Sequence, residues 1–124
     1  MRRWVEVWSR GWVAADVTAI AALYAENARF LSHPFRAPQE PRDYVVWAFA
    51  DQTHAECRFG EPIVAGDRAA VDWWAVLTAK DGALESLAGT SLLRFDESGL
   101  VVEQRDVWAS EPGRRELSDW ASVA

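Results

Sequence analysis

The chain has 124 residues, half of them apolar, and a formal net charge of −6. This length predicts a single domain over residues 1–124 with a sizeable hydrophobic core. The negative charge disfavours nucleic acid and anionic membranes as partners, because both are negatively charged themselves. No apolar run approaches the roughly 20 residues that a membrane-spanning helix needs. The opening residues also lack the pattern of a signal peptide.

Cysteine and histidine are scarce. Cys57 is the only cysteine, so no disulfide can form within the chain, and a free thiol suits a reducing cytoplasm. His33 and His54 are too few and too far apart to complete a structural zinc site with it. No glycine-rich phosphate loop or nucleophile motif occurs. We therefore expect a cytoplasmic protein without metal or cofactor.

Tryptophan is abundant, with eight in the chain. Tryptophan side chains supply large, rigid apolar surfaces that line pockets and interfaces as well as cores. The composition therefore favours a pocket that takes a small apolar or aromatic ligand.

The first third of the chain has the periodicity of two helices. Trp4, Trp8 and Trp12 recur every four residues, as on one face of an amphipathic helix. Asp16 follows as the N-cap of a second helix, whose apolar face reaches Tyr24.

The rest of the chain predicts mainly strands. A short strand at 28–31 precedes a proline-rich loop and a helix that starts at about Asp43. Turn signals then separate four longer strands, at about residues 55–65, 68–80, 83–95 and 99–109. A polar tail follows over residues 110–124, in which Trp120 is a candidate to pack back onto the body. This order predicts an α+β fold, with the N-terminal helices packed in the concave face of a curved antiparallel sheet.

Side chains alternate along a strand, which indicates what faces the helices. In the last strand, the charged residues Glu103 and Arg105 should point to solvent. Gln104, Asp106 and Trp108 then point inward.

The two preceding strands place Trp73 and Ser91 inward and Trp74 on the outer face. An exposed tryptophan on a sheet is unfavourable in water. We therefore expect a second copy of the chain to cover it, which gives a homodimer through the outer face of the sheet.

Asp106 is the main candidate for chemistry. A carboxylate among apolar side chains must be hydrogen-bonded, paired, or protonated with a raised pKa. A raised pKa is what a carboxylic acid or base needs near neutral pH. The alternative is a structural aspartate that pairs with neighbours of Arg105, with a backbone amide or with a helix end.

His33 is the second candidate, because it lies between a strand and the proline-rich loop and titrates near physiological pH. The alternative is a structural loop histidine. Ser91 on its own also fits a structural role, and His54 is expected to be solvated.

Two stretches resemble a known superfamily. Asp16–Pro34 resembles the opening of nuclear transport factor 2-like proteins. Gly89–Trp108 resembles their last two strands, especially those of the SnoaL-like polyketide cyclase branch. The resemblance spans roughly residues 4–109. It implies a cone-shaped, cystatin-like α+β barrel whose bent sheet encloses a pocket and commonly dimerises. It is weak for function, because the superfamily contains isomerases, cyclases, dehydratases, hydrolases and binding domains.

Position by position, the resemblance argues against ketosteroid isomerase itself. The place of that enzyme's base aspartate holds His33, that of its oxyanion-hole tyrosine holds Trp8, and its protonated aspartate falls near Ser91. SnoaL-like cyclases use an aspartate on the last strand, where this chain has Asp106. Dehydratases of the fold pair a histidine with an aspartate, which would here be His33 and Asp106.

Two hypotheses of different classes follow. The first is a cofactor-free isomerase, cyclase or dehydratase, in which Asp106 is the acid and base and His33 shares or relays the proton. Ser91 and Gln104 would orient a substrate oxygen. The apolar walls would be Trp8, Trp12, Trp47, Trp73 and Trp108. The second is a non-catalytic ligand-binding or dimerisation module of the same fold.

Overall fold

The computed structural model of the chain describes residues 1–117. The helices are α1 (Arg2–Ala14), α2 (Val17–Ala21) and α3 (Pro41–Phe49). The strands are β1 (Tyr24–Leu31), β2 (Gln52–Phe59), β3 (Ile63–Ala65), β4 (Arg68–Ala79), β5 (Leu84–Phe95) and β6 (Val101–Pro112).

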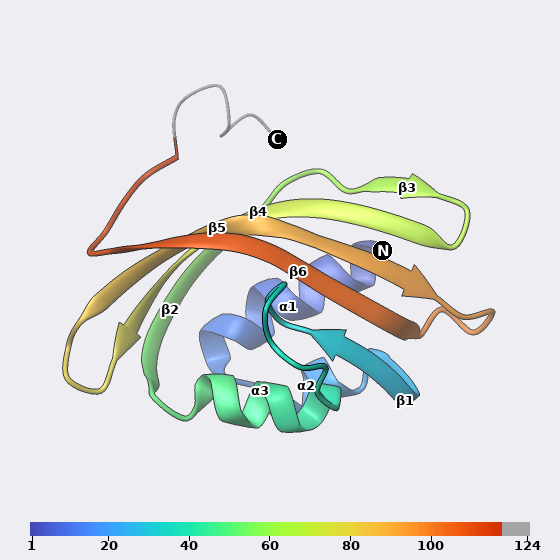
Figure 1. The fold of residues 1–124 in the computed structure, drawn as a ribbon, viewed down its shortest axis with the longest axis horizontal. Coiled ribbons are helices and arrows are strands. Elements are labelled where there is room, and N and C mark those ends of the chain that lie inside the picture. Colours follow the sequence, from blue (N-terminus) through green and yellow to red (C-terminus); the bar gives the residue numbers. More distant parts are fainter. Residues whose placement is uncertain (118–124) are drawn as a thin grey trace.

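The six strands form one open, curved sheet in the order β1-β6-β5-β4-β2, with the short β3 paired to β4. Figure 1 shows the sheet arching over the three helices, which confirms the α+β fold with helices in the concave face. β1 runs parallel to β6, whereas the other pairs are antiparallel. The sheet is therefore mixed, and the predicted antiparallel arrangement holds for every pair except β1 with β6. A helix and four strands separate β1 from β6 along the chain, and a connection of that length allows a parallel return.

The second helix is shorter than its periodicity predicts. Asp16 caps α2, because its carboxylate accepts a backbone N–H from the first turn. However, α2 ends at Ala21, and Tyr24 already begins β1. Asn27 has a positive φ of 63°, and the pairing register shifts within β1. Such a bulge interrupts the alternation of side chains, which is why the sequence indicated a strand over 28–31 alone.

The strand predicted over 55–65 is two strands, β2 and β3. Pro62 lies between them and has no N–H to donate to a neighbouring strand. A Cβ at Gly60 would fall 2.0 Å from the Asp72 carboxylate, so any other residue here would require the exposed Asp72 side chain to move. At the other end, β6 continues to Pro112, two residues into the predicted tail. The predicted position of Trp120 lies outside the described residues.

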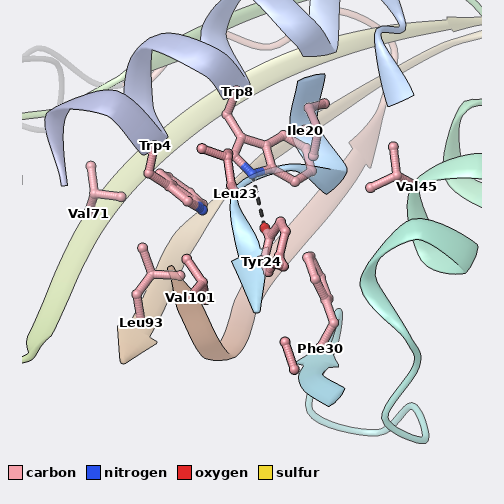
Figure 2. Close-up of a cluster of buried hydrophobic side chains, with 11 residues drawn as sticks. Trp4, Trp8, Ile20, Leu23, Tyr24, Phe30, Val45, Val71, Leu93 and Val101 are labelled. Carbon is pink, nitrogen blue, oxygen red and sulfur yellow. Dashed lines mark hydrogen bonds between the residues drawn. The ribbon is translucent and has the colours of Figure 1, made fainter. Parts of the chain in front are cut away.

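An aromatic core holds the helices against the sheet. Trp4 and Trp8 of α1 are buried with Ile20 of α2 and Phe30 of β1 (Figure 2). The Trp4 and Trp8 ring centroids lie 5.9 Å apart. A Cβ at Gly11 would lie 2.8 Å from Ile20 Cγ1, so glycine allows α1 and α2 to approach closely. This packing fixes the position of α1 over the concave face.

Along the long strands, alternation places the side chains as predicted. Trp73, Ser91 and Asp106 face the helices and are buried, whereas Arg105 is exposed. The pairing of β6 with β5 shifts by one residue near the start of β6, so that Val101 also faces the core. The shift lies before Gln104, and the inward positions beyond it are unaffected.

Trp74 lies on the outer face of the sheet, as predicted, but it is only 2% exposed. A C-terminal segment, residues 113–116, turns back over this face after β6. Trp74 Nε1 donates a hydrogen bond to the Arg115 carbonyl at 2.8 Å. The Arg58 guanidinium lies 4.4 Å from the centroid of the Trp74 ring. The expectation that a partner subunit covers Trp74 is therefore wrong, because the chain covers this residue itself.

Ser86 ties the C-terminal segment to β5. Its Oγ donates to the Gly113 carbonyl at 2.6 Å and accepts from the Arg115 N–H at 2.7 Å. Ser86→Ala leaves both backbone groups without this partner, and we expect the free energy of unfolding to fall by about 1–3 kcal/mol. Urea denaturation measures this loss. Ser98→Ala, at an exposed turn, should change it by less than about 0.5 kcal/mol. Equal effects of the two substitutions would contradict a stabilising role for the segment.

Candidate functional site

A pocket of about 410 Å³ lies between the helices and the concave face of the sheet. This volume falls within the range of small-molecule sites. Its wall is mainly aromatic, with a few polar groups. It is lined by Trp4, Trp8, Trp12, Arg36, Tyr44, Trp47, Ala48, Phe49, Ala50, Asp51, Gln52, Phe59, Trp73, Leu77, Glu85, Leu87, Ser91, Gln104, Asp106 and Trp108.

Asp106 is the titratable group buried in the pocket wall. It projects from β6 and is 8% exposed. Its Oδ1 accepts two hydrogen bonds, from Ser91 Oγ at 2.7 Å and from Gln104 Nε2 at 3.0 Å. Among the described residues, no side chain donates a hydrogen bond to Oδ2. Oδ2 is not one of the fully buried polar atoms that lack a hydrogen-bond partner, so part of its surface is accessible. Oδ2 is therefore the oxygen available to a ligand in the pocket.

Two chains of hydrogen bonds end on Asp106. In the first, Trp73 Nε1 donates to Ser91 Oγ at 3.0 Å, which fixes the serine hydroxyl toward the carboxylate. In the second, Trp8 Nε1 donates to the Tyr24 hydroxyl at 3.1 Å, the dashed bond in Figure 2. The Tyr24 hydroxyl in turn donates to Gln104 Oε1. Gln104 is thereby oriented with its NH₂ group toward Asp106.

The environment of Asp106 raises its pKa from the ordinary 3.8 to about 7. Burial is the main cause, because a charged carboxylate is poorly solvated among aromatic side chains. The hydrogen bonds from Ser91 and Gln104 act in the opposite direction and keep the shift smaller. Asp106 therefore changes its protonation near neutral pH, which suits a group that takes up and releases protons.

The tryptophan walls contact one another edge to face. The Trp8 and Trp12 centroids lie 5.9 Å apart, and those of Trp12 and Trp73 lie 5.6 Å apart. Trp108 is held by a hydrogen bond from its Nε1 to the Ser32 carbonyl. Such contacts stabilise the rings in fixed orientations.

The structure brings together eight of the nine residues singled out in the sequence. Asp106, Ser91 and Gln104 lie at one place in the wall, and the five tryptophans line the pocket with them. His33 is not among the lining residues. Its Nδ1 accepts the Phe35 backbone N–H at 3.2 Å, and its ring lies edge-on to Trp108 at 4.9 Å. Within the part of the chain that is described, no hydrogen bond joins His33 to Asp106.

Three polar residues of the site were missed in the sequence, namely Tyr24, Arg36 and Tyr44. Tyr24 was assigned to a helix, but it begins β1, and its hydroxyl donates to Gln104 Oε1. Tyr44 lies on α3, and burial raises the pKa of its hydroxyl, so it stays protonated. One signal was available: aromatic residues spaced by three, Tyr44 and Trp47, lie on the same helical face.

Arg36 lies in the loop between β1 and α3, which has no periodicity to read. Its guanidinium lies 5.2 Å from the Trp47 ring centroid and 5.3 Å from that of Trp108. It also donates to Ser32 Oγ at 3.1 Å. A cation is therefore held between two tryptophan rings in the pocket wall.

Among residues 1–117, no group of three histidine, cysteine, aspartate or glutamate side chains could hold a metal ion. In the same part of the chain, no helix has the length and apolar composition to cross a membrane.

The comparisons with known proteins agree with this architecture. The chain belongs to the SnoaL-like domain family, whose model matches residues 1–104. The match ends two residues before Asp106, so the family assignment does not depend on that residue. None of the curated proteins compared with the chain matches it.

Solved structures share the fold at low sequence identity. The epoxide hydrolase/cyclase-like enzyme SalBIII, described in pyran ring formation in polyether salinomycin, is 17% identical with a TM-score of 0.75, over 87% of this chain and 89% of that one. A protein with a ketosteroid isomerase-like fold from Catenulispora acidiphila, in complex with trimethylamine, is 18% identical with a TM-score of 0.71, over 82% of both chains. A nuclear transport factor 2-like protein of unknown function from an Exiguobacterium species is 17% identical with a TM-score of 0.69, over 92% and 98%.

The pKa of Asp106 predicts how stability depends on pH. The folded chain holds the proton up to about pH 7, whereas the unfolded chain releases it near the ordinary 3.8. The free energy of unfolding should therefore fall as pH rises between these values, by on the order of a few kcal/mol from this group. Asp106→Asn does not titrate, and Asn can still accept from Ser91 and Gln104. The free energy of unfolding of this variant should therefore fall less with rising pH than that of wild type. At pH 8 it should exceed the wild-type value.

Urea denaturation at pH 4.5 and pH 8 compares the variant with wild type. Glu97→Gln removes a carboxylate at an exposed turn and serves as the control, with a pH dependence like that of wild type. If Asp106→Asn also follows the wild-type pH dependence, Asp106 does not have a raised pKa.

Proposed function

We propose that the pocket binds a small, largely apolar carbonyl compound and that Asp106 moves a proton on it without a cofactor. The function is then that of an isomerase, cyclase or dehydratase. The observation that carries this is the state of Asp106. One carboxylate oxygen is fixed by Ser91 and Gln104, the other faces the pocket, and the pKa is about 7. A group held in this way is oriented toward a ligand and exchanges protons near neutral pH.

In the proposed step, ionised Asp106 removes a proton from the carbon next to the substrate carbonyl. The electrons of the broken C–H bond form a carbon–carbon double bond, and the carbonyl oxygen takes the negative charge. Protonated Asp106 then returns the proton at another carbon of the same conjugated system, or to an oxygen that leaves. The proton moves only between the substrate and the Asp106 carboxyl group, so the reaction needs no further reactant.

Tyr44 is the side chain best suited to donate a hydrogen bond to the charged oxygen. Its hydroxyl stays protonated, because burial raises its pKa, and it lines the pocket. The Asp106 charge contributes to that rise, which is consistent with a short distance between the two groups. Donors prearranged around a developing charge are usually a large part of catalysis. We leave His33 out of the proton path, because it does not line the pocket.

The comparisons support this class of function at the level of fold. SalBIII is described as an epoxide hydrolase/cyclase-like enzyme, and the Catenulispora protein was solved with a small molecule, trimethylamine. These likenesses favour ligand binding in this chain as well. The choice between catalysis and binding depends on Asp106, which each chain must supply for itself.

A non-catalytic binding module is the second candidate, and the composition of the wall favours it. Six tryptophans line the pocket, and three of them, Trp8, Trp73 and Trp108, already use their indole N–H groups within the protein. A ligand would thus meet mainly apolar surface. In that case Asp106 would select ligands and no bond would change.

Hydrogen–deuterium exchange distinguishes catalysis from binding. We expect the wild-type protein to accelerate exchange of the α-protons of 2-decalone in D₂O, followed by proton NMR. Asp106→Asn should lose on the order of 10²–10⁴-fold of this acceleration, the usual contribution of a general base. Tyr44→Phe should lose on the order of 10²-fold, because one donor to the enolate oxygen is removed.

Tryptophan fluorescence titrated with the same ketone serves as the binding measurement for each variant. Glu97→Gln, far from the pocket wall, should exchange like wild type. Binding by wild type without any accelerated exchange would overturn catalysis and leave the binding module. Accelerated exchange that survives Asp106→Asn would exclude Asp106 as the base.

A homodimer through the outer face of the sheet is a separate proposal. The C-terminal segment covers Trp74, but apolar residues beside it stay exposed: Ile63 by 74% and Val107 by 52%. If a second copy covers them, light scattering should give twice the mass of the chain, and Val107→Glu should halve that mass. A monomeric wild type would exclude this interface.

A further inference from the structure

The Arg36 guanidinium is a half-buried cation without an ion-pair partner among the described residues. It lines the pocket and is half-buried between the Trp47 and Trp108 rings. Of its five N–H donors, one at NH1 donates to Ser32 Oγ, and a further hydrogen-bonding contact with the Tyr44 hydroxyl lowers the pKa of that tyrosine. Ser32 itself is fully buried and anchors the loop. The guanidinium is therefore held in place, but most of its hydrogen-bonding capacity is unused.

No carboxylate neutralises Arg36 within residues 1–117, where every ion pair involves another arginine. None of the ion pairs in this part of the chain joins Arg36 to Asp106 either. Asp51 and Glu85 also line the pocket, but both are exposed at its rim, where water and salt screen them.

Tyr44 relates the two charged groups to each other. The Asp106 charge raises the Tyr44 pKa, and the Arg36 charge lowers it. Tyr44 is therefore near both, and the pocket lining includes a proton-exchanging carboxyl group as well as a fixed cation. A ligand that fills the aromatic space between them would meet both.

We propose that Arg36 binds an anionic group of the ligand, specifically a carboxylate, so that the substrate class is an apolar keto acid. This deepens the function proposed above and rests on it. The planar guanidinium matches a carboxylate, with which it forms paired, charge-assisted hydrogen bonds. A phosphate dianion is disfavoured, because a single cation in a chain of net charge −6 would face it.

The same geometry argues against a cationic ligand. Aromatic rings bind ammonium groups over their faces, but here Arg36 already occupies that position on Trp47 and Trp108. A second cation in the wall would be repelled by it. The site is thus expected to rank ligands of one shape in the order carboxylate, neutral amide, amine.

Isothermal titration calorimetry of the wild-type protein tests this order directly. The probes are 6-acetyl-2-naphthoate, the neutral 6-acetyl-2-naphthamide and the cationic 6-acetyl-2-naphthylmethylamine, which share one ring system and one ketone. We expect the carboxylate to bind on the order of tenfold or more tighter than the amide, as for a charge-assisted hydrogen bond. The amine should bind weakest.

Arg36→Met should make the affinities for the carboxylate and the amide about equal. Arg36→Lys keeps the positive charge and should retain part of the preference for the carboxylate. Arg42→Met removes a cation from an exposed position of α3 and is the matched control. It should preserve the wild-type ratio. Circular dichroism checks that each variant is folded, and the wild-type ratio needs no variant at all.

The outcomes separate this inference from the proposed function. Equal affinity for the three probes, or a wild-type ratio in Arg36→Met, overturns the carboxylate site and leaves ketone binding intact. Preferential binding of the amine also overturns it, in favour of an aromatic cation site. If none of the probes binds, both the pocket function and the carboxylate site fail.

Discussion

The burial of one carboxyl group shapes the interior of this domain. Asp106 lies among tryptophans, where an unpaired charge would be very unfavourable. Two donors to Oδ1 offset part of that cost, and each donor is itself oriented by an indole N–H, directly or through Tyr24. Hydrogen bonds therefore connect α1, β1, β4, β5 and β6 around a single acidic group. The site is fixed by the same contacts that assemble the fold.

Tryptophan serves two purposes in this arrangement. The rings of Trp8 and Trp73 supply apolar wall, while their N–H groups end in the network around Asp106. Trp108 donates its N–H group to the Ser32 carbonyl, and the Arg36 guanidinium lies over the face of its ring. A residue that is both apolar and a donor can line a cavity and still have its N–H group bonded, although the buried Trp4 N–H has no partner among the described residues. This accounts for a tryptophan-rich chain with a narrow range of polar side chains in its pocket.

Much of the fold and site follows from alternation in long strands. That pattern sufficed for Asp106, Ser91 and Gln104, because β5 and β6 are regular where these residues lie. It failed where the backbone departs from regularity, as at Tyr24 beside the bulge in β1. Arg36 could not be found this way, since its position depends on a loop folding against Trp47 and Trp108. The cover over Trp74 was missed for a similar reason, because a segment without periodicity makes it.

The parallel pairing of β1 with β6 has a consequence for how the protein folds. The hydrogen bond between Tyr24 and Gln104 joins residues 80 positions apart, and contacts of such separation form slowly because a long loop must close first. During synthesis, α1, α2 and β1 emerge long before their partner strand exists. Their aromatic faces must then wait unpaired, which is a state prone to aggregation. The pocket is therefore expected to be among the last features to assemble, and variants that weaken this edge should lower the yield of folded protein before they alter the finished site.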